Sequence, residues 1–311
     1  MNSVHLDKAA DGAVAQEDVI ILRRHWGQWI GAAVVIIVVC DLIYGAASNS
    51  KLKWSVVGQY LFSSQVLGGL KITIEVTVMA MVVAIIGGIV LALMRLSSNR
   101  VLQAVSVGYG ILFRGVPVMV QLLFWYFLAA IEPNLSLGFP FGGPHFFSVA
   151  TNTIITQLGA ATIGFGLHEA AYMSEIIRSG IISVDPGQQE AASALGMTRA
   201  KSFRRVILPQ AMRIILPPTG NQLISLFKAT SLVLVIGLAD LLTVVTEIYA
   251  RNFEQIPLLI VASIWYLVIT GVLSIIQYYM ERHFGRGARS ASTSSGKVAS
   301  TDPLGALNSE V

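Results

Sequence analysis

The sequence has few charged residues and a single cysteine. Of its 311 residues, 12% are charged and 54% are hydrophobic, whereas a soluble domain carries about 25% charged residues. With a mean hydropathy of +0.69, most of the chain is expected to be solvated by lipid. Cys40, the one cysteine, lies in an apolar run, which excludes a disulfide framework within the chain. The net charge of +4 indicates no nucleic-acid-binding surface.

Residues that would carry enzymatic or nucleotide chemistry are also missing. The phosphate-binding motif G-x-x-x-x-G-K-[ST] does not occur, and Gly296-Lys297 is followed by Val298 in a polar tail. No nucleophile with a base and no pair of carboxylates presents itself, and no second His or Cys lies at metal-ligand spacing from His168. The chain is therefore expected to be neither an enzyme acting alone nor a metal protein.

Six segments are apolar and long enough to cross a membrane. Because backbone polar groups find no water in the hydrocarbon core, each spanning segment must be a helix of about 20 mostly apolar residues. Arg114 and Pro117 interrupt the third segment, and Lys228 falls in the middle of the fifth. We therefore predict an all-α membrane protein of about six transmembrane helices, at residues 29–48, 66–95, 103–131, 150–179, 213–246 and 257–280. No internal repeat relates the first three to the last three.

The first segment also has features of a cleaved signal peptide. Arg23-Arg24 precede it, and the small residues Gly45-Ala46-Ala47 follow its apolar run. Its leader, residues 1–28, is longer than the usual charged region of a signal peptide. We therefore expect residues 29–48 to be retained as an extra transmembrane helix.

The distribution of Lys and Arg predicts which side of the membrane each loop faces. Most basic residues near the segment ends fall on one side, in groups that include 199–205 and 282–289, whereas the 132–150 loop on the other side has none. By the positive-inside bias, both termini are expected in the cytoplasm. Residues 1–28 form a polar N-terminus there, and 285–311 a Gly/Ser-rich tail with too little apolar surface to fold.

The predicted cytoplasmic loop between the fourth and fifth segments has the most informative pattern. Pro186-Gly187 is expected to turn the chain into a short helix that Gly196 ends. Thr198 can cap a second, basic helix, which Pro209 ends or bends toward the membrane. The product is a helix–turn–helix elbow. Such an elbow is compatible with a solvated loop, a DNA-binding helix-turn-helix motif or a docking element for a partner protein. The DNA-binding alternative is disfavoured, because a loop held at the membrane at both ends has no room for the third helix of a DNA-binding domain.

Several motifs stand in a fixed order along the chain. Glu190-Ala191-Ala192 is followed after three residues by Gly196, and after nine more by Val206-Ile207-Leu208-Pro209. This pattern resembles the EAA signature of permease subunits of ABC importers, with Val206 in place of Ile. Further blocks are similar to those of the histidine and glutamine permeases, with Val116 where Thr is usual: Phe113-Arg114-Gly115-Val116-Pro117 with Gln121, Ala171-Tyr172 with Glu175, Arg178 and Gly180, Gly187-Gln188, Pro209-Gln210-Ala211, and Lys228-Ala229-Thr230-Ser231-Leu232.

The resemblance covers about residues 66–282 and implies a five-helix type I importer core, with one additional N-terminal helix, in a bacterial inner membrane. It implies that the coupling loop 183–212 seats in a cleft of a separate ABC ATPase dimer, through Glu190, Ala191, Ala192, Gly196, Leu208 and Pro209. ATP and Mg²⁺ would then be bound by that partner, and this chain would bind no cofactor. A periplasmic or extracellular binding protein would deliver a polar amino acid. The second half of the pore would be another copy or a sister permease.

Polar residues at membrane depth are candidates for the substrate pathway, because such groups are costly there. At 100° per residue, His168, Tyr172 and Glu175 fall on one stripe of the fourth segment. Glu175 with Arg178 also has the i, i+3 spacing of a structural ion pair. The other candidates, for a substrate carboxylate or a gate, lie in the fifth segment at Lys228, Thr230 and Ser231.

Three classes of function are compatible with these features. The elbow and the ordered motifs favour the permease of an ATP-driven amino-acid importer. An ion-gradient-driven secondary transporter would use the same polar stripe but would not need the elbow, and the absence of an inverted repeat counts against it. A membrane-bound receptor or scaffold would bind a partner and carry no solute.

Overall fold

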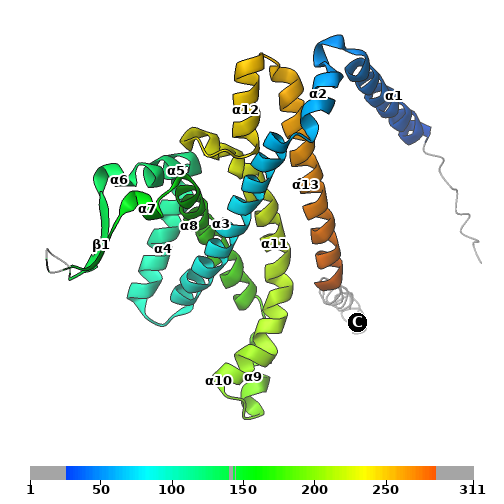
Figure 1. The fold of residues 1–311 in the computed structure, drawn as a ribbon. Helices are drawn as coiled ribbons and strands as arrows, with labels where there is room; N and C mark the ends of the chain where they lie inside the picture. The colour runs from blue at the N-terminus through cyan, green and yellow to red at the C-terminus, as the bar shows by residue number, and fades with distance from the viewer. Residues whose placement is uncertain (1–25, 140–142, 144, 285–311) are drawn as a thin grey trace, which may run out of the picture. The chain divides into compact units, whose positions relative to one another are not determined.

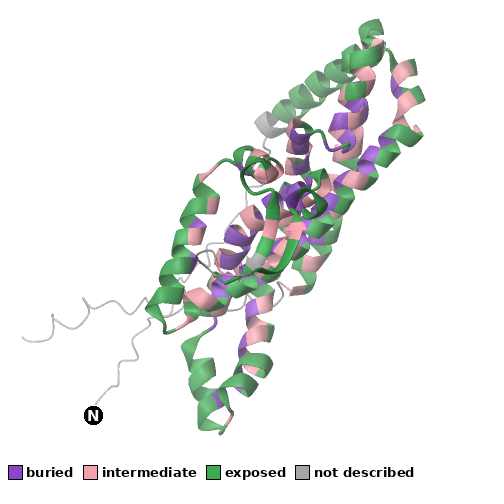
Figure 2. Cartoon of the chain, turned by 60° about the vertical axis from the view of Figure 1, so that its left-hand side comes forward, coloured by how far each residue is buried: buried purple, intermediate pink, exposed green. Residues whose placement is uncertain are grey.

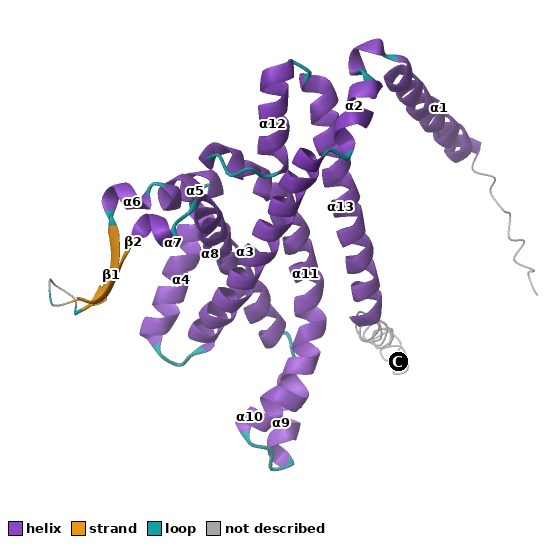
Figure 3. Ribbon diagram, in the orientation of Figure 1, coloured by secondary structure: helices purple, strands orange, loops and turns teal. Residues whose placement is uncertain are grey.

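The computed structural model describes residues 26–139, 143 and 145–284, most of them helical (Figures 1 and 3). The predicted tail at 285–311 and most of the predicted polar N-terminus lie outside these residues. The chain divides into two compact units, residues 1–52 and 53–311. Each unit is described by itself.

The first unit contains one long helix, α1 (Trp26–Ser48), and a short 3₁₀ turn, η1 (Ser50–Leu52). From Trp29 to Ser48 every side chain is exposed, and nearly all are apolar. A helix that is hydrophobic on all sides is suited to lipid rather than to water. This stretch is long and apolar enough to cross a membrane, and it coincides with the predicted first span.

The second unit is a bundle of helices with one small hairpin. Its elements in chain order are α2 (Trp54–Leu61), α3 (Ser64–Leu96), α4 (Arg100–Gly115), α5 (Val118–Tyr126), α6 (Leu128–Ile131), β1 (Asn134–Gly138), β2 (His145–Ala150), α7 (Thr151–Ile154), α8 (Gln157–Ile182), α9 (Pro186–Ala194), α10 (Arg199–Ser202), a π-helical turn η2 (Phe203–Ile207), α11 (Leu208–Ala229), a 3₁₀ segment η3 (Thr230–Ile236), α12 (Leu241–Asn252) and α13 (Gln255–Phe284).

Helices α3 and α8 form the centre of the bundle and pack closely along each other. The close approach depends on small residues: a Cβ on Gly88 would lie 2.5 Å from the Cβ of Met173, and one on Gly166 would lie 2.6 Å from Val83. Small residues at helix interfaces let membrane helices gain dispersion energy. Figure 2 shows the buried residues along these central helices, while most of the protruding α9–α10 region is exposed.

Two further clusters of buried side chains lie toward the ends of the bundle. One joins α2, α3, α12 and α13 through Val57, Val66, Leu241 and Leu258. The other joins the end of α8 to η2 and α11, around Ile207 and Ala211. The first cluster lies at the end of the unit that carries α12, and the second lies next to α9 and α10 at the opposite end (Figure 1).

The predicted third, fourth and fifth spans differ from the structure. The third is not one straight helix, because α4 and α5 meet at an angle of 99° at Val116-Pro117. The fourth begins at Gln157 rather than 150, after the separate short helix α7. The fifth ends at Ile236, where Gly237 takes a left-handed conformation with φ 68°. Its predicted end at 246 is wrong, since α12 is a separate helix.

Among the described residues, four helices are long and apolar enough to cross a membrane, or five if the bent pair α4–α5 is one span. The predicted number of six is therefore not confirmed. Helix α8 has the length of a span but carries His168, Glu169 and Glu175, and much of it is buried among other helices rather than exposed to lipid.

The expectation of a purely α-helical chain misses a hairpin. Strands β1 and β2 pair antiparallel, with Asn134 opposite Ala150 and a register shift between Leu137 and Gly138. The hairpin lies in the 132–150 loop, for which the sequence shows only a lack of basic residues. Its strand residues are mostly exposed, so no alternation of buried and exposed positions signals them in the sequence.

Candidate functional site

The elbow at residues 183–212 forms largely as the sequence predicts. Asp185 caps α9 by accepting a hydrogen bond from the Gly187 N–H at 2.7 Å, and Pro186 occupies the first turn. The helix ends before Gly196, whose φ of +71° is a conformation that glycine adopts without strain. Thr198 caps the next helix, with its hydroxyl 3.4 Å from the Lys201 N–H. The short first helix and the second cap are therefore confirmed.

The elbow exposes a large apolar residue at its tip. Leu195 is 82% exposed, whereas Ala192 is only 3% exposed, on a helix that packs against α10 and η2. Glu190, Ala191, Gly196 and Pro209 are exposed, and Leu208 is half-buried. Ala192 therefore stabilises the elbow itself, and Leu195, which the site prediction does not include, is the side chain most available to a partner.

The elbow is joined to the bundle by one continuous helix. Residues Arg199–Ile236 form a helical run of 38 residues that includes α10, η2, α11 and η3. Pro209 does not end the helix: it falls in the first turn of α11, where a missing N–H is tolerated, and the helical run continues through it. A bend at Pro209 stays a prediction. The π-helical turn Phe203–Ile207 precedes it directly, and such turns are frequent at functional positions.

The predicted polar stripe of α8 reaches the break between α4 and α5. The Gln121 amide nitrogen lies 3.1 Å from His168 Nδ1, and it also donates to the backbone oxygens of Phe113 (2.9 Å) and Val116 (2.8 Å). The Phe113 carbonyl has no helical partner because residue 117, four positions on, is a proline without an N–H, and Val116 lies in the break itself. The His168 and Tyr172 rings are 5.3 Å apart. The structure thus brings His168, Tyr172 and the bend together.

Glu175, the third member of the stripe, is held by two arginines. Its carboxylate contacts Arg178 at 2.5 Å on the same helix and Arg95 at 2.8 Å on α3. All three side chains are between a quarter and about a third exposed. The pair with Arg178 follows from its spacing, but the pair with Arg95 crosses 80 positions of sequence and has no local signal.

Lys228, Thr230 and Ser231 lie where α11 passes into η3. Lys228 is exposed, so the expected buried ammonium is not observed in the single chain. Thr230 is buried and donates to the Phe227 carbonyl at 2.7 Å, and the Ser231 hydroxyl donates to the Lys228 carbonyl at 2.9 Å. Their role in a substrate pathway stays a prediction.

Two buried polar networks have no counterpart among the residues predicted from the sequence. Glu169, 5% exposed on α8, accepts a hydrogen bond from Gln222 on α11. Asp240, fully buried, caps α12 through the Thr243 N–H at 2.9 Å and is 3.4 Å from the Tyr266 hydroxyl on α13. A polar residue in a largely apolar segment is the only signal available for such groups.

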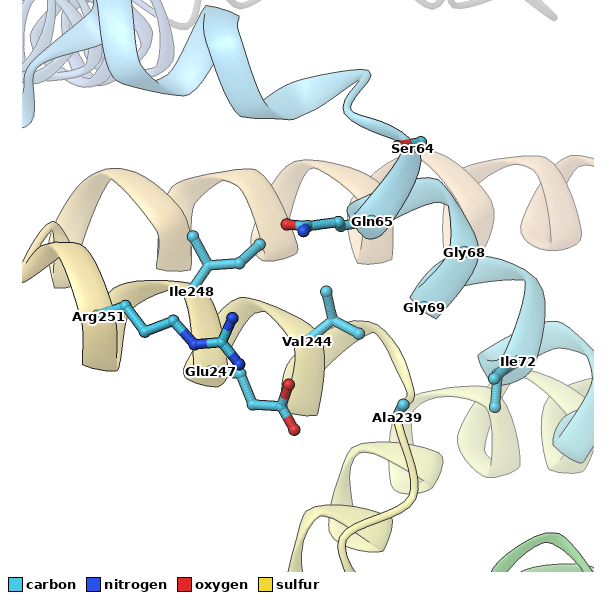
Figure 4. A pocket seen from close by; sticks show the side chains of 10 residues that line it. All are labelled: Ser64, Gln65, Gly68, Gly69, Ile72, Ala239, Val244, Glu247, Ile248 and Arg251. Carbon is cyan, nitrogen blue, oxygen red and sulfur yellow. The ribbon is translucent and has the colours of Figure 1, made fainter.

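A pocket lies beside α12, at the end of the unit opposite to the elbow (Figures 1 and 4). Its volume is about 310 Å³, and Glu247 and Arg251 of α12 contribute charges to its wall. Gly68 of α3 lines it with open space at the position of a Cβ. The remaining lining residues are Ser64, Gln65, Gly69, Ile72, Ala239, Val244 and Ile248.

Known proteins match this chain in sequence and in fold. Residues 84–286 match the family described as "Binding-protein-dependent transport system inner membrane component". The arginine transport system permease protein ArgU of Corynebacterium glutamicum is 41% identical over 296 residues, which cover 93% of this chain and 90% of the relative. The glutamate/aspartate import permease protein GltK of Escherichia coli is 38% identical, with 70% of this chain and 92% of the relative covered.

Among solved structures, an amino acid ABC transporter crystallised with histidines is similar, with a TM-score of 0.59 and 34% identity over 70% of this chain and 94% of that one. The chain belongs to the family of binding-protein-dependent transport system inner membrane components. The prediction of a permease subunit of an amino-acid ABC importer is confirmed, as is that of a multi-pass membrane protein. The alternative of an ion-gradient-driven secondary transporter is not supported.

Proposed function

We propose that this chain forms half of the translocation pathway for a polar amino acid and is driven by a separate ATPase that docks on the elbow. The observation that carries the proposal is the exposed tip at Leu195, fixed to the bundle by the continuous helix Arg199–Ile236. An exposed apolar side chain at the tip of a short, capped helix suits a groove in a partner protein. The elbow therefore faces the cytoplasm, where ATP is available.

The other partners follow from this assignment. The end of the unit opposite to the elbow faces the outside, where a soluble binding protein delivers the amino acid. The second half of the pathway is another copy of the chain or a sister permease. ATP and Mg²⁺ belong to the ATPase, and the polar groups of His168, Tyr172, Glu175 and Lys228 line the pathway. The relatives, an arginine transport system permease and a glutamate/aspartate import permease, support an amino acid as substrate.

The elbow is tested with a change at its exposed tip. Leu195→Asp places a charge where an apolar contact is proposed, so it should reduce co-purification of the ATPase and ATP-driven uptake in proteoliposomes by at least about tenfold. Membrane insertion and thermal unfolding should not change, since the side chain is 82% exposed. Ala192→Asp is a poorer test, because that residue is buried within the elbow and the change would disrupt the elbow itself.

Phe146→Asp is the matched control. Phe146 is 73% exposed, on the hairpin, so its replacement removes a comparable apolar side chain away from the elbow. The Phe146→Asp variant should still co-purify with the ATPase and should keep its ATP-driven uptake. Wild-type uptake and ATPase binding by Leu195→Asp would show that the elbow is not the docking element.

A further inference from the structure

The turn between α12 and α13 exposes an aromatic ring in an unfavourable backbone conformation. Phe253 follows the last residue of α12 with φ 61° and ψ 17°, and its N–H donates to the Tyr249 carbonyl at 2.8 Å. Glycine usually takes this left-handed position at the end of a helix, because a Cβ is strained there. The Phe253 side chain is nevertheless 82% exposed, so packing within the chain does not compensate for the strain.

Side-chain contacts fix the residues on either side of Phe253. Glu254, the next residue, forms an ion pair of 2.5 Å with Lys53 at the start of α2. Asn252 accepts from the Glu254 N–H at 3.0 Å, and its amide lies 3.5 Å from the Tyr60 hydroxyl. Lys53 itself has a φ of 44°, and it and Phe253 are the non-glycine residues with positive φ in the described chain. Strained conformations that the neighbouring structure maintains are concentrated at functional sites.

The pocket shown in Figure 4 extends to the last turn of α12, next to the turn that carries Phe253. Arg251, two residues before Phe253, lines that pocket together with Glu247 one turn earlier. A large exposed aromatic side chain is typical of an interface centre, where aromatic anchors contribute most of the binding energy, and charged groups such as those of Glu247 and Arg251 are typical of the polar rim. The turn lies at the end of the unit opposite to the elbow (Figure 1).

We propose that the α12–α13 turn, with Phe253 as its anchor and the adjoining pocket as its flank, is the surface on which the soluble binding protein docks. This inference rests on the proposed function, which places the elbow in the cytoplasm and this turn outside. The description of the family names dependence on a binding protein, and under the proposed function that protein meets the chain at this end. The alternative role for Phe253 is that of a membrane anchor, with its ring in the lipid headgroup layer.

The experiment uses the complete importer, with its ATPase and second permease half, reconstituted in nanodiscs. ATP hydrolysis is measured against the concentration of the cognate binding protein loaded with its amino acid. Phe253→Asn should raise the half-maximal concentration at least tenfold and leave basal hydrolysis unchanged. The thermal unfolding midpoint should stay the same or rise, because Asn tolerates the left-handed conformation better than Phe. Gly68→Leu, which fills the pocket, should also raise the half-maximal concentration.

Tyr279→Ala is the control, because Tyr279 is 63% exposed near the other end of α13 and its loss should leave the half-maximal concentration unchanged. An unchanged value for Phe253→Asn, in an importer that the binding protein stimulates normally, would overturn the docking surface and leave the proposed function intact. If that variant instead lost thermal stability or recovery in nanodiscs at an unchanged half-maximal concentration, Phe253 would be a membrane anchor. An importer that no binding protein stimulates would overturn the proposed function as well.

Discussion

At the residue scale, Glu175 takes part in two of the three ion pairs found among the described residues. Its carboxylate joins Arg178 of its own helix to Arg95 of α3, so it links the two central helices near the end of α8 that leads into the elbow. An ion pair that is only partly exposed keeps more of its strength than one at the surface, because fewer waters screen it. The same carboxylate therefore contributes to stability, whatever its contact with a substrate.

Replacing this carboxylate should have a measurable cost. Glu175→Gln keeps the shape of the side chain but leaves two guanidinium groups without their counter-charge, so the free energy of unfolding should fall by about 1–2 kcal/mol. In detergent this corresponds to a thermal midpoint lower by about 3–6 °C. Glu190→Gln, at an exposed position of α9, is the control and should change the midpoint little. Equal midpoints for both variants would show that the Glu175 ion pairs are not stabilising.

The sequence contains part of the information at this scale. The pair of Glu175 with Arg178 follows from helical spacing, and the caps at Asp185 and Thr198 follow from residue type. The contacts of Arg95 with Glu175 and of Gln222 with Glu169 join residues 80 and 53 positions apart. Such contacts depend on how whole helices pack, which no local pattern encodes.

At the scale of elements, the close packing of α3 on α8 should be sensitive to added volume. Gly88→Leu would drive a side chain into Met173, whose Cβ lies 2.5 Å from the point that a Cβ on Gly88 would occupy, and overpacking of this kind costs about 1–3 kcal/mol or more. The thermal midpoint and the yield of folded protein should both fall. The measurement is thermal unfolding of the purified chain in detergent.

Gly68→Leu makes the same change on the same helix where there is open space. It should be neutral or stabilise by about 0.5–1 kcal/mol, because leucine favours the helix over glycine. If both variants unfolded at the same temperature, small residues at the α3–α8 interface would not explain the stability of the bundle.

The elements are predictable where the sequence has strong local signals. Long apolar runs locate α1, α3 and α13 within a few residues, and the Pro-Gly and Thr signals locate the elbow. The sequence alone does not predict that the chain bends at Pro117 but continues as a helix through Pro209. Proline ends a helix in one context and is tolerated in a first helical turn in another. Helix packing decides between the two outcomes.

At the scale of the whole molecule, the division at residue 52 has a consequence for truncation. Residues 53–311 form a compact unit with its own buried clusters. A chain that begins at residue 53 should therefore fold in detergent with a thermal midpoint within a few degrees of the full chain, as measured by unfolding and by size-exclusion chromatography. Aggregation of the truncated chain, with the full chain monodisperse, would show that α1 is required for the fold of the second unit.

Under the proposed function, the continuous helix Arg199–Ile236 would act as a lever arm. Its 38 residues correspond to a rod of about 57 Å at 1.5 Å per residue, with the elbow at one end and η3 at the other. The bond of Gln222 to Glu169 lies between them as a fulcrum, and Pro217 and Pro218 inside α11 remove two backbone donors just before it. A tilt of roughly 10° about that contact would move the elbow end of the helix, about 35 Å away, by about 6 Å, and the η3 end, about 21 Å away, by about 4 Å in the opposite direction. A displacement imposed at the elbow would therefore reach η3 as a smaller, opposite shift.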